Sequence, residues 1–287
     1  MPRVSVITPA HDNAATIDAT IASVVAQGFA DWELVVCDDA SHDDTPQRVE
    51  TAAAADPRVR LVRAPSNLGP AGARNVALAA ATGELVAFLD ADDRFAAEYL
   101  ETMVARYDAE APGVGIVCCD AWLEDAAGTR LGRYRDRQGG AGGAGVTEVL
   151  RDNPILIASL CPRAAVDEAG GFSTECWGSE DHDLWLRIVE AGQRVVYVDE
   201  PLVFYRVAEG SISSSRTRMA RTDQATFRRA LDRGRLDGEQ TVIARDRLAL
   251  AQAAEAVARG ARPRDVAVLA RAVVARARLR RRGTVER

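Results

Sequence analysis

Cysteine, aromatic residues and lysine are scarce or absent in this chain of 287 residues. The five cysteines are odd in number and show no CxxC spacing, which argues against a disulfide scaffold and favours buried thiols in a reducing compartment. Aromatic residues make up only 5% of the chain, and all 36 basic residues are arginines. The remaining composition, 47% hydrophobic and 27% charged, is typical of a globular protein.

Long apolar runs are also missing. No stretch reaches the roughly 18 apolar residues that a membrane-spanning helix needs. A strand pattern begins at Val4, without the basic and apolar segments of a signal peptide. We therefore expect a cytoplasmic protein.

Most of the chain has no excess of basic residues. The formal net charge is −6, so the whole protein has no general attraction for nucleic acid. The segment from Arg216 to the C-terminus is the exception, with 19 arginines and only 8 acidic residues. An acidic body therefore carries a basic tail.

The first half of the chain alternates strand and helix patterns. Apolar or β-branched runs predict strands at residues 4–8, 33–37, 58–63 and 85–89. Helical patterns lie between them at residues 16–27, 45–55 and 71–81. This order predicts an α/β fold with a mostly parallel sheet and helices on both faces.

The second half is less regular. Helices are predicted at residues 96–109, 164–169 and 180–191, and strands at 115–123, 155–162, 195–198 and 202–207. Glycines dominate residues 138–145, which we interpret as a surface loop that either closes over a bound acceptor or is a disordered insertion. After residue 215 the alanine- and arginine-rich chain is predicted to be helical.

Polar clusters follow three of the predicted strands. TPAHD ends at Asp12, DDAS begins at Asp38 and DADD begins at Asp90. Because ligands of such sheets bind beyond the carboxyl ends of the strands, we expect the three clusters to converge on one rim.

The DADD cluster places Asp90, Asp92 and Asp93 within four positions. Carboxylates this close repel one another unless a divalent cation lies among them. Oxygen ligands suit Mg²⁺ or Mn²⁺, which also bind phosphate oxygens. The motif taken alone favours the alternative that Asp90 and Asp92 cap the next helix while Asp93 is solvated.

Two further clusters each allow two interpretations. Asp39 either accepts an N–H group of a nucleobase or forms a turn leading into the helix at Thr45. His11 either stacks on a base or is a half-exposed loop residue.

A fourth cluster, WGSEDHD, begins at Trp177 and precedes the helix that contains Trp185. One carboxylate can take a proton from an attacking hydroxyl, and an aromatic face packs on the C–H groups of a sugar. A helix start with Ser179 as N-cap is the alternative. It explains the position of the cluster but not Trp177 or the run of acids with His182.

Together the four clusters resemble the inverting glycosyltransferases of family 2, which have the GT-A fold. The matching segments are VSVITPAHDNAATIDATIASVVAQGFADWELVVCDDAS, NLGPAGARN, GELVAFLDADD and GGFSTECWGSEDHDLWLRIVEAG. The resemblance covers roughly residues 4–215. It implies a Rossmann-like, mostly parallel sheet flanked by helices, followed by a C-terminal helical extension.

The resemblance also implies roles for individual residues. The nucleotide-sugar donor is expected to contact Pro9, His11, Asp39, Arg74 and Asp90. Mn²⁺ or Mg²⁺ is expected at Asp92 with Asp90, the catalytic base at Asp181, and acceptor contacts at Trp177 and Glu180.

The chain departs from the family pattern at three positions. His11 stands where Tyr or Phe is usual, Asp12 where Asn is usual, and Ala208 where relatives often carry His. The QxxRW signature of processive synthases is absent. We therefore expect transfer of one sugar, or a few, from a UDP-sugar by default to a hydroxyl of a discrete acceptor: a glycan precursor, a lipid-linked sugar or a natural product.

Two rival functions stay open at this point. A haloacid-dehalogenase-like Mg²⁺-dependent phosphatase also uses a DxD after a strand, although Arg94 stands where Thr or Val is usual there. A non-catalytic nucleotide-sugar-binding protein would bind donor without turnover. A dinucleotide dehydrogenase is disfavoured because no GxGxxG follows the first strand.

The expected organisation has three parts. Residues 1–110 form the nucleotide-sugar-binding half and 111–215 the acceptor-binding half of one domain, and 216–287 form a basic helical extension. An amphipathic pattern at 265–279, followed by three arginines, suits a peripheral contact with the inner face of a membrane, packing on the acidic body or a homodimer contact.

Overall fold

A computed structural model describes residues 1–138, 143–207 and 216–260. The chain divides into two compact units, Met1–Ala208 and Glu209–Arg287, and each is described by itself. Residues 139–142 of the glycine-rich stretch, Ala208, and the amphipathic segment 265–279 with its following arginines lie outside the described residues.

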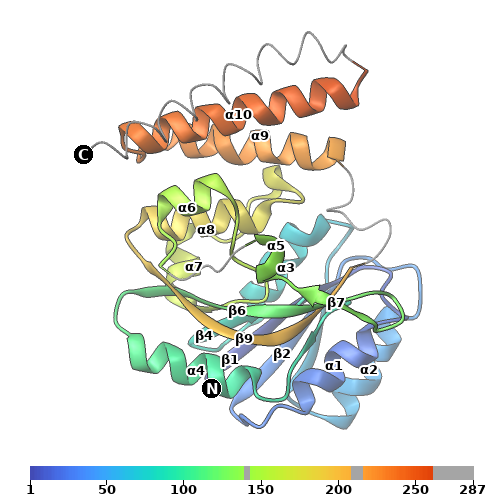
Figure 1. Ribbon diagram of the computed structural model, residues 1–287. Helices are drawn as coiled ribbons and strands as arrows, with labels where there is room; N and C mark the ends of the chain where they lie inside the picture. The colour runs from blue at the N-terminus through green and yellow to red at the C-terminus, as the bar shows by residue number, and fades with distance from the viewer. Residues whose placement is uncertain (139–142, 208–215, 261–287) are drawn as a thin grey trace. The chain divides into compact units, whose positions relative to one another are not determined.

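The first unit is built on one large sheet flanked by helices (Figure 1). The sheet has nine strands in the order β3-β2-β1-β4-β8-β6-β9-β5, and β7 pairs with β6. The strands are β1 (Val4–Ala10), β2 (Trp32–Asp38), β3 (Val59–Arg63), β4 (Leu85–Phe88), β5 (Arg94–Phe95), β6 (Val114–Glu124), β7 (Arg130–Arg133), β8 (Leu160–Pro162) and β9 (Arg194–Arg206). Strands β1 to β4 are parallel, as is the β6–β9 pair, whereas β8, β5 and β7 run antiparallel to their neighbours.

Helices connect these strands. They are α1 (Ile17–Val25), α2 (Thr45–Ala55), α3 (Gly69–Ala80), α4 (Tyr99–Glu110), α5 (Arg135–Gln138), α6 (Val146–Arg151), α7 (Arg163–Ala169) and α8 (Glu180–Glu190), with a 3₁₀ turn at Thr174–Cys176. The helix predicted at residues 45–55 is confirmed with those bounds.

Strand β4 packs against apolar side chains on both faces of the sheet. Leu85 and Ala87 belong to the same buried cluster as residues of α1 and α4. Phe88 points the other way, and its ring centroid lies 6.2 Å from that of Trp185 on α8. Side chains alternate between the two faces of a strand. The sequence of a strand in a sheet covered on both faces is therefore a continuous apolar run. This packing fixes the end of β4, where the acidic cluster begins.

Several predicted bounds in the second half need correction. The predicted strands 195–198 and 202–207 are one strand, β9, because β6 pairs along its whole length through a register shift at Asp120, opposite Pro201. Only Leu160–Pro162 of the predicted strand 155–162 pairs in the sheet. The short elements β5, β7, α5 and α6 were not predicted, since each is too short to show a periodic pattern.

The second unit contains helices α9 (Arg216–Asp232) and α10 (Gly238–Ala258), which pack on each other. Glu255 on α10 accepts hydrogen bonds from Arg221 at 2.7 Å and Gln224 at 2.8 Å on α9. The side chain of Asp237 caps α10 by accepting from the Gln240 amide. Across the described part of the chain, no helix combines the length and the hydropathy needed to cross a bilayer.

Candidate functional site

The acidic cluster after β4 divides into three different environments. Asp93 is 2% exposed, and its Oδ1 accepts a hydrogen bond of 2.8 Å from the backbone N–H of Arg206 on β9. Burial, together with the charges of Asp92 and Asp90, raises the pKa of Asp93 well above its usual value. The alternative in which Asp93 is solvated is therefore wrong: this carboxyl lies inside the fold and ties β9 to the loop after β4. Helix α4 also begins after Glu98, so the acidic cluster does not cap it.

Asp90 forms part of a buried charge bridge. Arg74 on α3 donates to Asp90 Oδ1 over 2.6 Å and to Glu180 Oε1 over 2.6 Å. Burial disfavours the charge on Arg74, but Asp90 and Glu180 outweigh it and raise the pKa of the guanidinium. The bridge connects the end of β4 to the start of α8, and so it joins two clusters that are far apart in the sequence.

Asp92 is the half-buried member of the cluster that forms no ion pair with another of the described residues. Burial followed by the charge of Asp90 raises its pKa to about 6. A half-buried carboxylate beside a second carboxylate is a donor set of hard oxygen atoms. Such a set fits Mg²⁺ or Mn²⁺, whose charge would remove the repulsion that raises the pKa.

Asp181 lies in the first turn of α8. Its Oδ1 accepts from the His182 amide at 2.7 Å, and its Oδ2 accepts from Asn153 Nδ2 at 3.2 Å. Burial and the neighbouring charge of Glu180 raise the pKa of Asp181 to about 7. A carboxylate with a pKa near neutrality is suited to accept a proton at physiological pH.

The carboxyl ends of β1 and β2 meet the loop before α3. Asp39 is 3% exposed, and its Oδ1 accepts a hydrogen bond of 2.7 Å from the Leu68 amide. His11 contacts the Asp39 carbonyl oxygen at 2.9 Å through Nδ1 and Asn67 Nδ2 at 3.1 Å through Nε2. Pro9 is half-buried on β1. The first two predicted clusters therefore do lie side by side at this rim.

A cavity of about 170 Å³ lies next to this rim. Its lining comes from the loop and start of α3 and from the 3₁₀ segment before α8, namely Asn67, Leu68, Gly69, Ala71, Thr174 and Trp177. Trp177 is 47% exposed, which is unusual for so large an apolar side chain. The cavity thus has one aromatic wall that is open to a ligand.

Two predicted site residues have contacts other than those expected from the sequence. Arg74, predicted to face the nucleotide, is 4% exposed and occupied by two carboxylates. Glu180, predicted to contact the acceptor, is 6% exposed, and its Oε2 accepts from the Gly178 amide at 2.6 Å. Both side chains hold the site together in this conformation.

Sequence reasoning missed three asparagines at the site. Asn153 contacts Asp181, and Asn67 contacts His11. Asn75 exchanges two hydrogen bonds with the backbone of Phe172, at 2.8 and 2.9 Å, and thereby fixes α3 to the segment before α8. Asn75 follows Arg74 in the GARN segment, which was a usable signal, whereas nothing in the sequence around Asn153 links it to a residue 28 positions away.

Comparison with known proteins shows which proteins this chain resembles. The sequence profile of "Glycosyl transferase family 2" matches residues 5–158. The O-antigen biosynthesis protein RfbC of Myxococcus xanthus is 32% identical over 228 residues, covering 78% of this chain and 17% of RfbC. The WfgD protein of Escherichia coli, a UDP-Glc:α-D-GlcNAc-diphosphoundecaprenol β-1,3-glucosyltransferase, is 44% identical over 102 residues, 36% of this chain and 40% of WfgD. The chain therefore spans less than half the length of these two relatives.

Among solved structures, the mannosyltransferase PcManGT of Pyrobaculum calidifontis was determined in complex with GDP-Man and Mn²⁺. It superposes with a TM-score of 0.64 at 26% identity, over 96% of this chain and 80% of PcManGT. The GT-A type of α/β fold expected from the sequence is confirmed. The family match covers more than half of the residues, and the chain belongs to glycosyl transferase family 2.

Proposed function

We propose that this protein transfers a sugar from a nucleoside-diphosphate sugar, UDP-linked by default, to a hydroxyl group of a discrete acceptor with inversion at the anomeric carbon. The observation that carries the proposal is Asp181, a carboxylate with a pKa raised to about 7. It adjoins Glu180, which the Arg74 bridge connects to the acidic cluster at Asp90.

In this proposal the nucleobase binds at the rim formed by β1, β2 and the loop before α3. Asp39 uses Oδ1 for the Leu68 amide, and Oδ2 receives no hydrogen bond from the described residues. That second oxygen can accept an N–H group of a base. The imidazole of His11 and the ring of Pro9 would pack on the base, because both belong to the same strand end.

A divalent cation would be held by Asp92, with Asp90 beside it. When bound, such an ion neutralises the negative charge that develops on the diphosphate leaving group. Asp90 is fixed for this task by Arg74, while Asp93 faces Arg206 and the interior and takes no part. The oxygen-only donor set favours Mn²⁺ or Mg²⁺.

Asp181 is assigned as the general base. Its carboxylate would accept the proton of the acceptor hydroxyl as that oxygen attacks the anomeric carbon from the face opposite the diphosphate. A single displacement of this kind inverts the anomeric centre. Asn153 and the His182 amide hold both carboxylate oxygens in place, and Asn153 favours the charged form that can take a proton.

The acceptor is proposed to lie on Trp177. Its exposed indole forms one wall of the 170 Å³ cavity, where a sugar ring can pack its C–H groups. WfgD acts, by its name, on a diphosphoundecaprenol-linked GlcNAc, so a lipid-linked sugar is the acceptor class we favour. The basic extension from Arg216 onward would then provide a peripheral contact with an anionic membrane on the cytoplasmic side.

A transfer assay with the full chain tests the proposal. UDP-, dTDP- and GDP-sugars are screened by thermal shift with and without Mn²⁺, since a ligand that binds the native state raises its stability. Donors that bind are then incubated with a lipid-linked GlcNAc acceptor. Asp181→Asn should lower the transfer rate about 10²- to 10⁴-fold while sparing donor affinity.

Asp108→Asn, which removes an exposed carboxylate on α4, is the matched control and should leave the rate unchanged. Wild-type rates in Asp181→Asn would refute the assignment of the base. Metal-dependent donor binding without transfer to any acceptor would instead favour a non-catalytic binding protein.

A further inference from the structure

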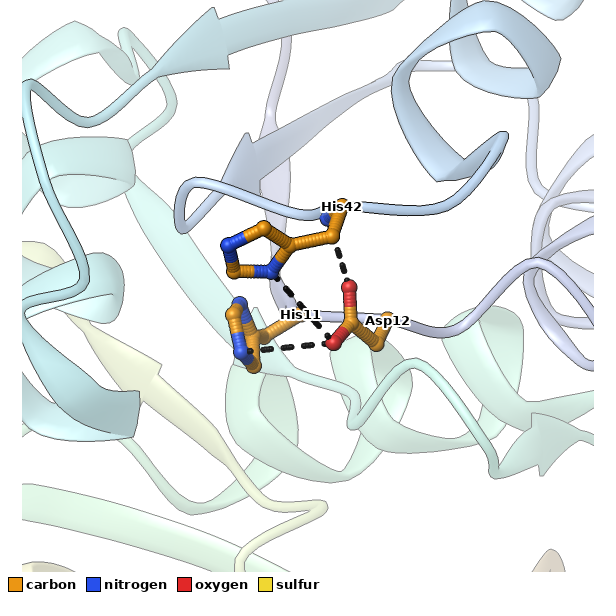
Figure 2. Close-up of side chains that lie close together, drawn as sticks. All are labelled: His11, Asp12 and His42. Atoms are coloured by element: carbon orange, nitrogen blue, oxygen red, sulfur yellow. Dashed lines mark hydrogen bonds and ion pairs between the residues drawn. The ribbon is translucent and has the colours of Figure 1, made fainter.

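Two loops at the rim bring two imidazoles and a carboxylate together. His11 and Asp12 follow β1, and His42 follows β2. One metal-binding atom from each of these three side chains lies within 4.8 Å of the others. Asp12 Oδ2 is 3.6 Å from His11 Nε2 and 3.7 Å from His42 Nδ1, so one carboxylate oxygen faces both rings (Figure 2).

The remaining atoms of two of these side chains are already held. His11 Nδ1 lies 2.9 Å from the Asp39 carbonyl oxygen. A carbonyl can only accept, so in the neutral imidazole Nδ1 carries the proton and Nε2 keeps its lone pair. Asp12 Oδ1 accepts from the His42 amide at 2.7 Å, which leaves Oδ2 free to turn toward the rings. Hydrogen bonds of this kind on the outer atoms orient the ligands of metal sites.

We propose that His11, Asp12 and His42 form a zinc site, separate from the oxygen-ligand site at Asp92. Two neutral imidazoles and one carboxylate suit Zn²⁺ better than Mg²⁺ or Mn²⁺, whose preferred ligands are oxygens. Three protein ligands leave the fourth tetrahedral position for water or a ligand atom.

Two of the three spacings are already close to those of a zinc site, and the third, between the two imidazoles, is within 4.8 Å. Ligand atoms about 2.0–2.1 Å from a tetrahedral zinc are separated from each other by about 3.3 Å. The two distances to Asp12 Oδ2, 3.6 and 3.7 Å, are close to that value. The side chain of His42 is 84% exposed and has room to rotate inward. Asn67 Nδ2, now 3.1 Å from His11 Nε2, would give way to the ion.

Zinc bound here would link the loop after β1 to the loop after β2. Both loops contain backbone positions with left-handed φ angles, 54° at Asp12 and 59° at Ala40, that residues other than glycine rarely adopt. A ligand that binds only the folded arrangement stabilises it. The site therefore predicts a zinc-dependent increase in thermal stability that does not depend on any nucleotide or acceptor.

Zinc titration of the full chain tests the proposal. The metal-free protein is titrated with Zn²⁺ against a chromogenic chelator, in millimolar Mg²⁺ to occupy the oxygen-ligand site. We expect one Zn²⁺ per chain with a micromolar or tighter Kd and a higher Tm. His42→Ala and Asp12→Asn should each weaken the Kd by at least about tenfold and abolish the increase in Tm.

Matched measurements make the result specific. Asp31→Asn removes an exposed carboxylate at the opposite end of β2 and should leave the zinc Kd unchanged. His42→Gln is the second variant should the alanine variant unfold early without metal. Absence of zinc binding below 100 µM, or the same Kd in wild type and the His42 variants, would overturn the proposal.

Discussion

Arg74 on α3 and Glu180 at the start of α8 form a buried ion pair 2.6 Å long, although 106 residues separate them in the chain. The same guanidinium holds Asp90, so one arginine neutralises carboxylates from two clusters. Removal of the arginine leaves both carboxylates without the cation that neutralises them. The pair thus connects the stability of the fold to the geometry of the proposed site.

Arg74→Met should lower the free energy of unfolding by about 3–5 kcal/mol, because it leaves buried carboxylates without a partner. Urea denaturation at neutral pH measures the change. Arg63→Met is the control, since Arg63 pairs with Glu50 at the surface and its loss should cost less than about 0.5 kcal/mol. An equal loss of unfolding free energy in the two variants would contradict the conclusion that the Arg74 bridge stabilises the fold.

Asp92→Asn and Asp93→Asn should behave differently. Asp92 is assigned to the cation, so its amide variant should bind Mn²⁺ at least about tenfold more weakly. Asp93→Asn keeps an oxygen for the Arg206 amide, so its Mn²⁺ affinity should stay within about twofold of wild type. Calorimetric titration with Mn²⁺ and a nucleoside diphosphate distinguishes them, and the reverse order would remove Asp92 from the site.

The rate of sugar transfer should fall as the pH drops through about 7, because Asp181 becomes protonated. Asn153→Ala removes a hydrogen bond that favours the charged form and so raises the pKa of Asp181 further. At pH 7 this variant should be about two- to fivefold slower. At pH 9 the two proteins should have similar rates, and a pH-independent loss would indicate a purely structural role for Asn153.

Asp181→Asn should stabilise the protein at high pH. Because the folded-state pKa is raised from 3.8 to about 7, the native protein binds the Asp181 proton more tightly than the unfolded chain does. Ionised Asp181 therefore costs stability above pH 7, and this cost declines as the pH falls from 7 toward 3.8. We expect the variant to gain about 1–3 kcal/mol at pH 8 and nothing at pH 4. Chemical denaturation at the two pH values tests the sign.

Trp177→Ala should weaken acceptor binding and leave the fold intact. Loss of an aromatic contact with a sugar is worth about 0.5–1.5 kcal/mol, so the acceptor KM should rise about two- to thirteenfold with little change in donor KM. Leu131→Ala is the control, because Leu131 is also an exposed apolar residue but lies on β7; neither KM should change. A rise in donor KM alone would place Trp177 at the donor instead.

The sequence predicted the alternating strands and helices of the first half and the polar clusters at their ends. The apolar strands of the first half, such as β4, and its helices, such as the alanine-rich α3, each have a sequence pattern that can be recognised without the structure. The bounds were less accurate in the second half, where β9 continues past Pro201 because β6 supports it along its length. A neighbouring strand is a tertiary influence, which no local pattern contains.

The sequence by itself determined that the chain has four clusters of polar residues that resemble those of sugar-transferring enzymes. Residue identity and spacing along the chain are local properties, so these clusters can be recognised without the structure. Only the tertiary structure decided what each carboxylate does. Asp93 faces the interior, Asp90 and Glu180 share Arg74, and Asp181 rests on Asn153. Burial and the distance between charges set the pKa of a carboxyl group, and both arise only when distant segments pack together.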